Sequence, residues 1–276
     1  MIRSSHYPPC SGRLLKRMLY SLLIALPLCS TLASAQTLRV AAASDLQFAL
    51  PVIAAQFEAQ SGTKLSVTYG SSGNFLSQIQ NGAPFDLFFS ADVGYPQILL
   101  EAGFAEPGSL RPYAVGRLVL WFPPDSPLDP VKLRWDALLD PRVQKIAIAN
   151  PDHAPYGRAA VAALQKAGFY DQVKSKFVYG ENISQAAQFA QSGSAQAGIL
   201  ALSIALSPSL QSGKRWEIPS DFYPPIQQGV VLLKSSPNKP AALAFLAFFQ
   251  TESARATLAR FGFTLPNANL SSEPKP

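Results

Sequence analysis

Residues 38–45 read LRVAAASD and residues 64–74 read KLSVTYGSSGN, and both stretches follow the same plan. Each begins with a segment that has the length and pattern of a strand and continues into a turn that contains serine, and apolar residues at helical spacing follow it. A strand that leads through a polar turn into a helix, twice in succession, predicts an α/β fold with a mostly parallel sheet.

The alternation of strand and helix continues along the chain and indicates two α/β lobes. We expect strands at 38–43, 64–69, 86–90, 115–122, 145–149, 177–179, 197–202 and 228–234. We expect helices at 46–60, 75–80, 93–102, 157–168 and 184–193 and two more within 240–261, with Pro51 causing a kink or a late start. The chain should cross between lobes near Gly116 and return near Gln227. Lobe 1 then comprises residues 36–116 and 227–266, lobe 2 comprises 117–226, and 267–276 form a loose tail.

The N-terminal 35 residues have the pattern of a signal peptide. Arg13, Lys16 and Arg17 precede an apolar stretch at 18–32, and the small-residue pattern Ala33-Ser34-Ala35 follows it. We expect export with cleavage after Ala35. An uncleaved membrane anchor is the alternative, although the apolar stretch is short for a membrane span.

Removing residues 1–35 changes both the charge and the cysteine content. The segment contains four of the 23 basic residues and no acidic one, so 19 basic residues remain against 17 acidic ones, a net charge of +2. This balance gives no support for a nucleic-acid partner. Cys10 and Cys29 also lie in the segment. The remainder therefore has no disulfide, no cysteine zinc site and no cysteine nucleophile.

The two serine turns are candidate anion-binding sites. Free N–H groups at a helix start, together with serine hydroxyls, donate hydrogen bonds to an anion. For Ser44 the alternative is a helix N-cap, and for Ser72, between Gly70 and Gly73, it is a flexible turn. Residues 69–80 contain no Lys or Arg and no G-x-x-x-x-G-K pattern, which argues against a nucleotide phosphate loop.

A secreted serine hydrolase is the alternative from a different functional class. It would combine Ser44 or Ser72 with His153 and an aspartate such as Asp152. However, the sequence has no G-x-S-x-G elbow around either serine. His153 is the only histidine after the signal segment, so a zinc or copper site lacks ligands.

The sequence resembles a known family, the periplasmic molybdate-binding proteins (ModA) of ABC importers. The resemblance extends from about Leu38 to Pro266, and its motifs occur in the order of the family. They are AAAS (41–44), GSS (70–72), GAPFDLFFSAD (82–92), NPDHAPYG (150–157) and RFGFTLP (260–266).

The resemblance implies the two-lobed fold of type II periplasmic binding proteins, with an oxyanion in the cleft between the lobes. Ser44 and Ser72 would bind the ion through their hydroxyls, and Tyr156 and Ile183 through their backbone amides. Some family members add a tyrosine hydroxyl where this chain has Ala201, and the Asp45 amide would replace that bond.

The implied function is capture of molybdate or tungstate in the periplasm and delivery to the membrane permease of an ABC importer. The protein would act as a monomer, without enzymatic activity and without a cofactor. A site with donors only favours a fully deprotonated oxyanion and rejects hydrogen phosphate, whose proton would find no acceptor. Binding of sulfate, thiosulfate or another oxyanion is the alternative within the same class.

Overall fold

The structure is a computed structural model that describes residues 1–2, 4–7 and 37–265. Its contacts divide the chain into two units, Met1–Ser34 and Ala35–Pro276, and every helix and strand below belongs to the second unit. The expected cleavage site after Ala35 and the expected tail at 267–276 lie outside the described residues. Where the structure describes the chain, it contains no helix with the length and apolar character needed to cross a membrane.

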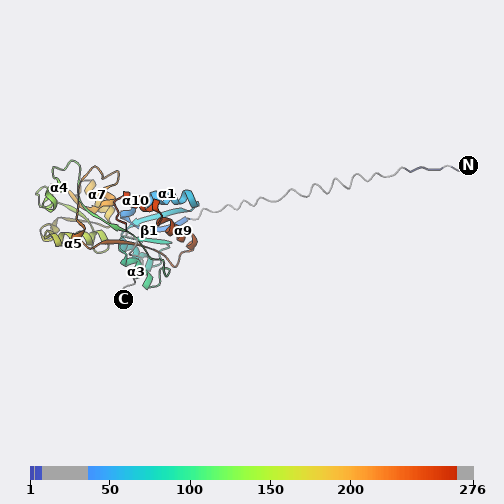
Figure 1. Ribbon diagram of the computed structural model, residues 1–276, viewed down its shortest axis with the longest axis horizontal. Helices are drawn as coiled ribbons and strands as arrows, with labels where there is room; N and C mark the ends of the chain where they lie inside the picture. The colour runs from blue at the N-terminus through green and yellow to red at the C-terminus, as the bar shows by residue number, and fades with distance from the viewer. Residues whose placement is uncertain (3, 8–36, 266–276) are drawn as a thin grey trace. The chain divides into compact units, whose positions relative to one another are not determined.

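Within the described residues, ten strands form two five-stranded sheets, and we call each sheet with its helices a lobe (Figure 1). The first sheet has the order β2-β1-β3-β10-β4, and the second has the order β7-β6-β8-β5-β9. The first sheet consists of β1 (Thr37–Ala43), β2 (Lys64–Gly70), β3 (Leu87–Ser90), β4 (Arg111–Gly116) and β10 (Ile226–Leu232). The second consists of β5 (Leu118–Phe122), β6 (Ile146–Ala149), β7 (Phe177–Gly180), β8 (Ala197–Ala201) and β9 (Lys214–Glu217).

In each sheet one strand runs against the other four. That strand is β10 in the first sheet and β5 in the second, and each pairs with antiparallel neighbours on both sides. The remaining neighbours are parallel. The prediction of a two-lobed α/β fold is confirmed, and the sheets are mixed, since half of their pairings are antiparallel.

The helices follow the predicted alternation. The α-helices are α1 (Ala49–Ser61), α2 (Ser72–Gln80), α3 (Gly94–Glu101), α4 (Pro130–Leu133), α5 (Pro155–Ala167), α6 (Tyr170–Val173), α7 (Ile183–Gln191), α8 (Leu202–Ala205), α9 (Lys239–Phe249) and α10 (Glu252–Arg260). Four 3₁₀ turns accompany them: η1 (Ser44–Leu46), η2 (Arg134–Leu138), η3 (Lys174–Lys176) and η4 (Ser220–Phe222). Pro51 is the third residue of α1, so the late start that it predicts is the observed outcome.

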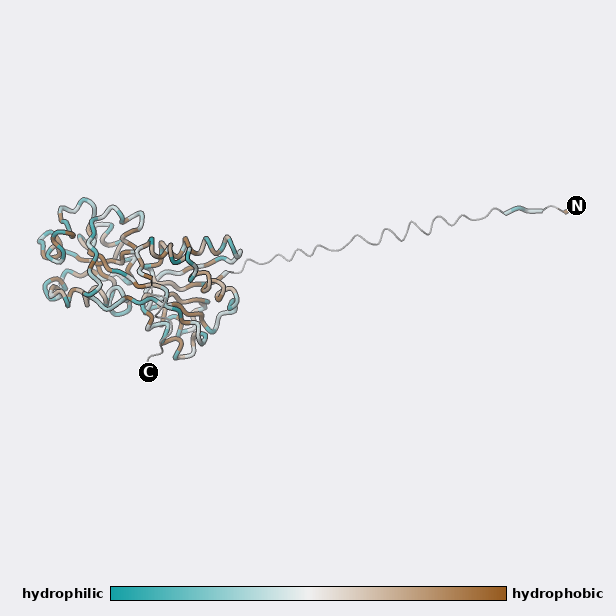
Figure 2. Tube along the Cα trace, in the orientation of Figure 1, coloured by the Kyte–Doolittle hydropathy of each residue, from teal (hydrophilic) through white to brown (hydrophobic). Residues whose placement is uncertain are grey.

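Helices cover both faces of the first sheet, because successive residues of a strand point to opposite faces. In β1, Leu38, Val40 and Ala42 join a buried cluster with residues of α1, α9 and α10, whereas Ala41 joins a cluster with residues of α2 and α3. Figure 2 shows hydrophobic stretches running through the interior of this unit. The apolar strands predicted from the sequence are therefore core strands with both faces buried.

The chain crosses between the sheets at Arg117. The predicted single strand at 115–122 is wrong, because Val115 pairs with Gln227 in the first sheet while Leu118 pairs with Ala201 in the second. The last residues of β4 and all of β5 are apolar, so the two strands look like one continuous run in the sequence. Strand β9, at the edge of its sheet, is absent from the prediction because its sequence, KRWE, is charged, as edge strands often are. The lobe boundaries at 116 and 227 stay a prediction.

Candidate functional site

The two serine turns lie side by side at one end of the first sheet. Strands β1 and β2 are parallel and pair in register, with Ala43 opposite Gly70. Ser44 begins η1 directly after β1, and Ser72 begins α2 two residues after the end of β2, with Ser71 between them. Because the carboxyl ends of parallel strands share one edge of a sheet, the register brings the two turns together.

The second lobe repeats this arrangement with two helix starts. Strands β6 and β7 are parallel, with Ala149 opposite Gly180, and α5 and α7 begin shortly after them. Tyr156 is the second residue of α5 and Ile183 the first of α7. The amides of a first helical turn have no partner within the helix.

The capping hydrogen bonds at the starts of α5 and α7 do not involve the amides of Tyr156 and Ile183. The side chain of Asn182 accepts from the amides of Ser184 and Gln185, the second and third residues of α7. In α5, the carbonyl of Ala154 accepts from Gly157 and Arg158. Neither set of bonds within the described chain uses the N–H of Ile183 or of Tyr156.

All five predicted site residues line one small cavity between the lobes. Ser44, Asp45 and Ser72 come from the first lobe, and Tyr156 and Ile183 come from the second. The other residues that line it are Ala43, Gly70, Ser71, Ala91, Ala154, Pro155 and Asn182. The cavity has a volume of about 10 Å³, which suits a single small ion and is too small for an organic molecule.

The hydroxyls of Ser44 and Ser72 accept backbone hydrogen bonds. Ser44 Oγ accepts from the amide of Ser184 at 3.4 Å, and Ser72 Oγ accepts from the amide of Ala91 at 3.0 Å. Each hydroxyl proton then stays available for donation to a ligand, since a hydroxyl both accepts and donates. The helix-cap alternative for Ser44 is wrong, because η1 has Ala43 as its N-cap residue and no side-chain cap. Likewise, Ser71 and not Ser72 is the N-cap residue of α2.

Asp45 contributes a buried carboxyl as well as an amide. The whole residue is buried, and its Oδ2 accepts hydrogen bonds from Tyr156 Oη at 2.9 Å and from Gln228 Nε2 at 2.5 Å. Burial raises the pKa of Asp45 to about 6, although these two hydrogen bonds and the nearby amides of Asp45 and Leu46 favour the charged form. An ionised carboxyl is an acceptor, so the sequence-based description of the site as donors only is incomplete.

The carboxyl of Asp45 was missed as a feature of the site, and the chain contains one signal of it. Gln228 is a polar residue within strand β10, and unlike the exposed Gln227 beside it, it is fully buried. A buried polar side chain in a core strand needs a hydrogen-bond partner, and Asp45 is that partner. Ala201, where some ModA proteins have a tyrosine, ends β8 and is not among the residues that line the cavity.

His153 is not placed as a base for either predicted serine. Its Nδ1 lies 2.9 Å from the hydroxyl of Ser71, and that hydroxyl also lies 2.6 Å from the backbone oxygen of His153, to which it donates. The ring nitrogen must then donate to Ser71 Oγ, so the imidazole does not take a proton from it. Asp152 offers its backbone amide to Asn150 Oδ1. This geometry is that of a structural contact between lobes.

Contacts between the lobes surround the cavity. The amide of Gly73 donates to the carbonyl oxygen of His153 at 3.0 Å, and a Cβ at residue 73 would lie 2.8 Å from that oxygen. Glycine is therefore required here for the approach of the second lobe. The contacts that join the lobes include Ser44–Ser184, Asp45–Tyr156, Gly73–His153, Asn74–Glu181 and Asp92–Arg158. This structure is a closed form.

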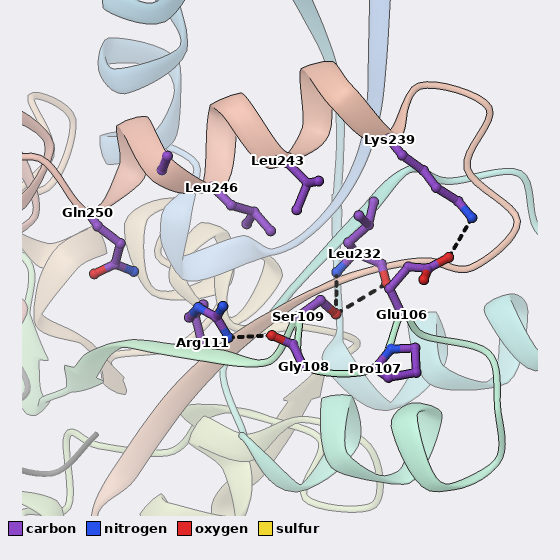
Figure 3. A pocket seen from close by; sticks show the side chains of 11 residues that line it. Glu106, Pro107, Gly108, Ser109, Arg111, Leu232, Lys239, Leu243, Leu246 and Gln250 are labelled. Carbon is purple, nitrogen blue, oxygen red and sulfur yellow. Dashed lines mark hydrogen bonds and ion pairs between the residues drawn. The ribbon is translucent and has the colours of Figure 1, made fainter. Parts of the chain in front are cut away.

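The chain also has a larger cavity of about 360 Å³ beside α9, shown in Figure 3. Its polar groups bind one another: Lys239 pairs with Glu106, and Arg111 donates to the carbonyl oxygen of Gly108. The side chains of Leu232, Leu243 and Leu246 also line it. No predicted site residue lines this cavity, and it offers no converging donors to a small ion.

The charge of the small cavity restricts its ligands. Among the described residues that line it there is no Lys, Arg or His, and Asp45 is the only acid. The described part of the chain also has no group of three His, Cys, Asp or Glu side chains that could hold a metal ion. Hydroxyls and amides that converge on a space of this size suit a small oxyanion.

Comparison with protein families and individual proteins gives consistent matches. The family model of bacterial extracellular solute-binding proteins matches residues 38–264. The molybdate-binding protein ModA of Rhodobacter capsulatus is 40% identical over 211 residues, which are 76% of this chain and 81% of that protein. The protein of the same name from Azotobacter vinelandii is 38% identical over 252 residues, which are 91% of this chain and 98% of that protein.

The same similarity appears in three dimensions. The solved structure of the periplasmic molybdate-binding protein of Azotobacter vinelandii superposes with a TM-score of 0.79 and 35% sequence identity. The superposition covers 83% of this chain and 100% of that one. The two chains therefore share their fold over the full length of the solved structure.

Proposed function

The chain belongs to the ModA family of bacterial extracellular solute-binding proteins, and from this premise we propose that it captures molybdate or tungstate and delivers the ion to an ABC importer. The observation that carries the proposal is the small cavity between the lobes. Ser44, Ser72, Tyr156 and Ile183 line it, and among the described residues that line it there is no Lys, Arg or His. The names of the relatives from Rhodobacter and Azotobacter support the same ligand.

We propose that hydrogen-bond donors from both lobes bind different oxygens of the ion. Ser44 and Ser72 donate from their hydroxyls, and Tyr156 and Ile183 donate from their backbone amides. The Asp45 amide is a fifth donor. Several hydrogen bonds of this kind offset the cost of removing a dianion from water without the need for a cation in the site.

Delivery requires that the importer distinguishes the loaded protein from the free one. The ion is held between the lobes, so the contacts that join them are favoured when it is bound. The membrane permease would bind this closed form. No group in this scheme performs chemistry, so the protein acts as a carrier and not as an enzyme. It needs no cofactor, because the metal arrives as part of the oxyanion.

The remaining parts of the proposal concern processing and assembly. Export agrees with the description of the family as extracellular. We place cleavage after Ala35 and the processed protein in the periplasm as a monomer. Residues 36–116 and 227–266 form its first lobe, 117–226 its second, and 267–276 a tail.

Calorimetric titration tests the ligand directly. We expect molybdate and tungstate to bind at least about tenfold more tightly than sulfate, and phosphate to bind more weakly still. The four anions are titrated into the same preparation under identical salt, because exposed charges respond to ionic strength. Sulfate binding as tight as molybdate binding would contradict the proposal.

A further inference from the structure

Asp45 is the one acidic residue among the described residues that line the cavity, and the two oxygens of its carboxyl have different surroundings. Oδ2 accepts from Tyr156 Oη, which comes from the second lobe, and from Gln228 Nε2, which comes from β10 of the first lobe. Oδ1 is buried and has no hydrogen-bond partner of normal geometry among the described residues. A buried polar atom without a partner costs about 1–3 kcal/mol, so its presence beside a ligand cavity calls for an explanation.

Ionised, this carboxyl is unsuited to a neighbouring oxyanion. A carboxylate only accepts hydrogen bonds, and molybdate likewise only accepts them. The two like charges also repel each other strongly in a site that excludes water. A proton removes both problems, because a protonated carboxyl donates one hydrogen bond. Oδ2 already accepts two donors, so the proton belongs on Oδ1.

We propose that Asp45 takes up one proton when the oxyanion binds and donates a hydrogen bond to it from Oδ1, so that capture is coupled to protonation. This inference rests on the proposed function and adds a proton to the bound state. It also explains selectivity. With Asp45 protonated, the cavity offers donors only, whereas an ionised Asp45 would accept the proton of hydrogen phosphate and favour that ion.

Burial, and not a neighbouring charge, favours protonation of Asp45. Tyr156 on α5 and Tyr113 on β4 are the titratable groups that interact with it, and burial, followed by the charge of Asp45, raises the pKa of both phenols. Burial brings the pKa of Asp45 to about 6, and a dianion in the cavity would raise it further. Ser203 on α8 donates to the backbone oxygen of Asp45 at 2.9 Å and carries no charge.

The neighbours also hold the carboxyl in place. A Cβ at residue 116 would lie 2.2 Å from Tyr156 Oη, so Gly116 lets this hydroxyl approach the backbone of β4 and reach Asp45. Gln228 Nε2 lies 3.2 Å from the same hydroxyl. Asp45, Tyr156 and Gln228 thus form one buried network with a fixed Oδ2, and the free oxygen is the only part of the carboxyl left for a ligand.

The test is calorimetric titration of the full chain with molybdate at about pH 6, 7 and 8, each in two buffers of different ionisation enthalpy. The difference in heat between buffers gives the number of protons taken up. We expect uptake of about one proton per ion at pH 8, and we expect affinity to fall by roughly tenfold per pH unit above pH 6. Tight binding with no proton uptake and no pH dependence would overturn the inference.

Asp45→Asn is the decisive variant, because asparagine keeps the acceptor for Tyr156 and Gln228 and has a permanent donor in place of Oδ1–H. We expect it to bind molybdate with proton uptake near zero and an affinity that does not change between pH 6 and 8. Asp171→Asn, which removes an exposed aspartate paired with Lys174, is the control and keeps the wild-type proton uptake. Proton uptake that persists in Asp45→Asn would assign the proton elsewhere and overturn the inference.

Phosphate separates the possible failures. If Asp45 stays ionised in the complex, hydrogen phosphate competes with molybdate at pH 8 in the wild type and loses this ability in Asp45→Asn, which overturns the inference alone. If molybdate does not bind at any pH, or if sulfate binds equally well, the proposed function fails. We expect that phosphate does not compete with molybdate for either protein.

Discussion

The half of the cavity that the first lobe supplies differs from the half that the second lobe supplies in the kind of atom that can donate to an ion. The first half has the side chains of Ser44, Ser72 and Asp45, positioned at the ends of β1 and β2. The second half has the backbone amides of Tyr156 and Ile183 at the starts of α5 and α7. One half depends on residue identity, and the other depends on where helices begin.

The difference has an energetic side as well. Side-chain donors bring a buried acid with them, since Asp45 lies in the same turn as Ser44 and is fully buried. Backbone amides at a helix start bring no charged group, and the helix dipole makes them favourable to an anion. The first half therefore carries a cost to the folded protein that the second half does not.

We expect the largest effect on the free energy of unfolding, which the buried carboxyl of Asp45 lowers at high pH. Because folding raises the pKa of Asp45 from 3.8 to about 6, its protonation favours the folded state. This contribution is fully present below about pH 4 and is lost as the pH rises through about 6. Asp45→Asn cannot ionise, so we expect it to raise the free energy of unfolding at pH 8 by up to about 3 kcal/mol.

Urea unfolding of the free protein at pH 4 and pH 8 measures this effect. The variant and the wild type should have nearly equal stability at pH 4 and should diverge as the pH rises. A variant that is less stable than the wild type at pH 8 would show that the carboxylate, and not the acid, is the form suited to this site.

The second largest effect concerns the half of the cavity that the second lobe supplies through backbone amides. Ile183→Pro removes one amide donor while keeping the helix, because proline fits the first helical position and Asn182 before it is extended, with φ −144° and ψ 176°. We expect molybdate affinity to fall by about 2–3 kcal/mol, the loss of one hydrogen bond to a charged partner. Ile183→Ala is the matched control, because it shortens the same side chain and keeps the amide. Equal losses in both variants would point to packing and remove the amide from the site.

Loss of a side-chain donor should have a somewhat smaller effect. Ser72→Ala removes a hydroxyl that accepts from Ala91 and has a proton to donate, and we expect molybdate affinity to fall by about 1.5–2 kcal/mol. Ser71→Ala is the comparison, since the Ser71 hydroxyl donates to the backbone oxygen of His153. Calorimetric titration of both variants should show the larger loss in Ser72→Ala, and the reverse order would assign the donor to Ser71.

The same contrast explains what the sequence could predict. Serine after an apolar strand is a visible signal, so the sequence itself marks Ser44 and Ser72 as candidates. Ile183 could not, because an amide donor has no residue preference, and only the family resemblance indicated it. The crossing at Arg117 was misplaced into one strand for a related reason: the end of β4, Ala114–Gly116, and the whole of β5 are both apolar, although they belong to different sheets.

The hydrogen bonds of the Asp45 carboxyl could not be predicted from the motif that contains it. Its partners, Tyr156 and Gln228, are 111 and 183 residues away along the chain, so no local pattern connects them. The role of Gly73 likewise depends on a distant segment, since it accommodates His153 of the second lobe. In both cases the missing information is which distant segments the fold brings together.

The smallest effect belongs to the rim, where both halves meet outside the cavity. Asn74 Nδ2 donates to Glu181 Oε1 at 3.1 Å, and this contact joins the lobes in an exposed position. Because water competes for both groups, we expect Asn74→Ala to change molybdate affinity by no more than about 0.5 kcal/mol. Titration at low and high salt measures it. A loss as large as that of Ser72→Ala would mean that closure of the lobes, and not donation inside the cavity, limits the affinity.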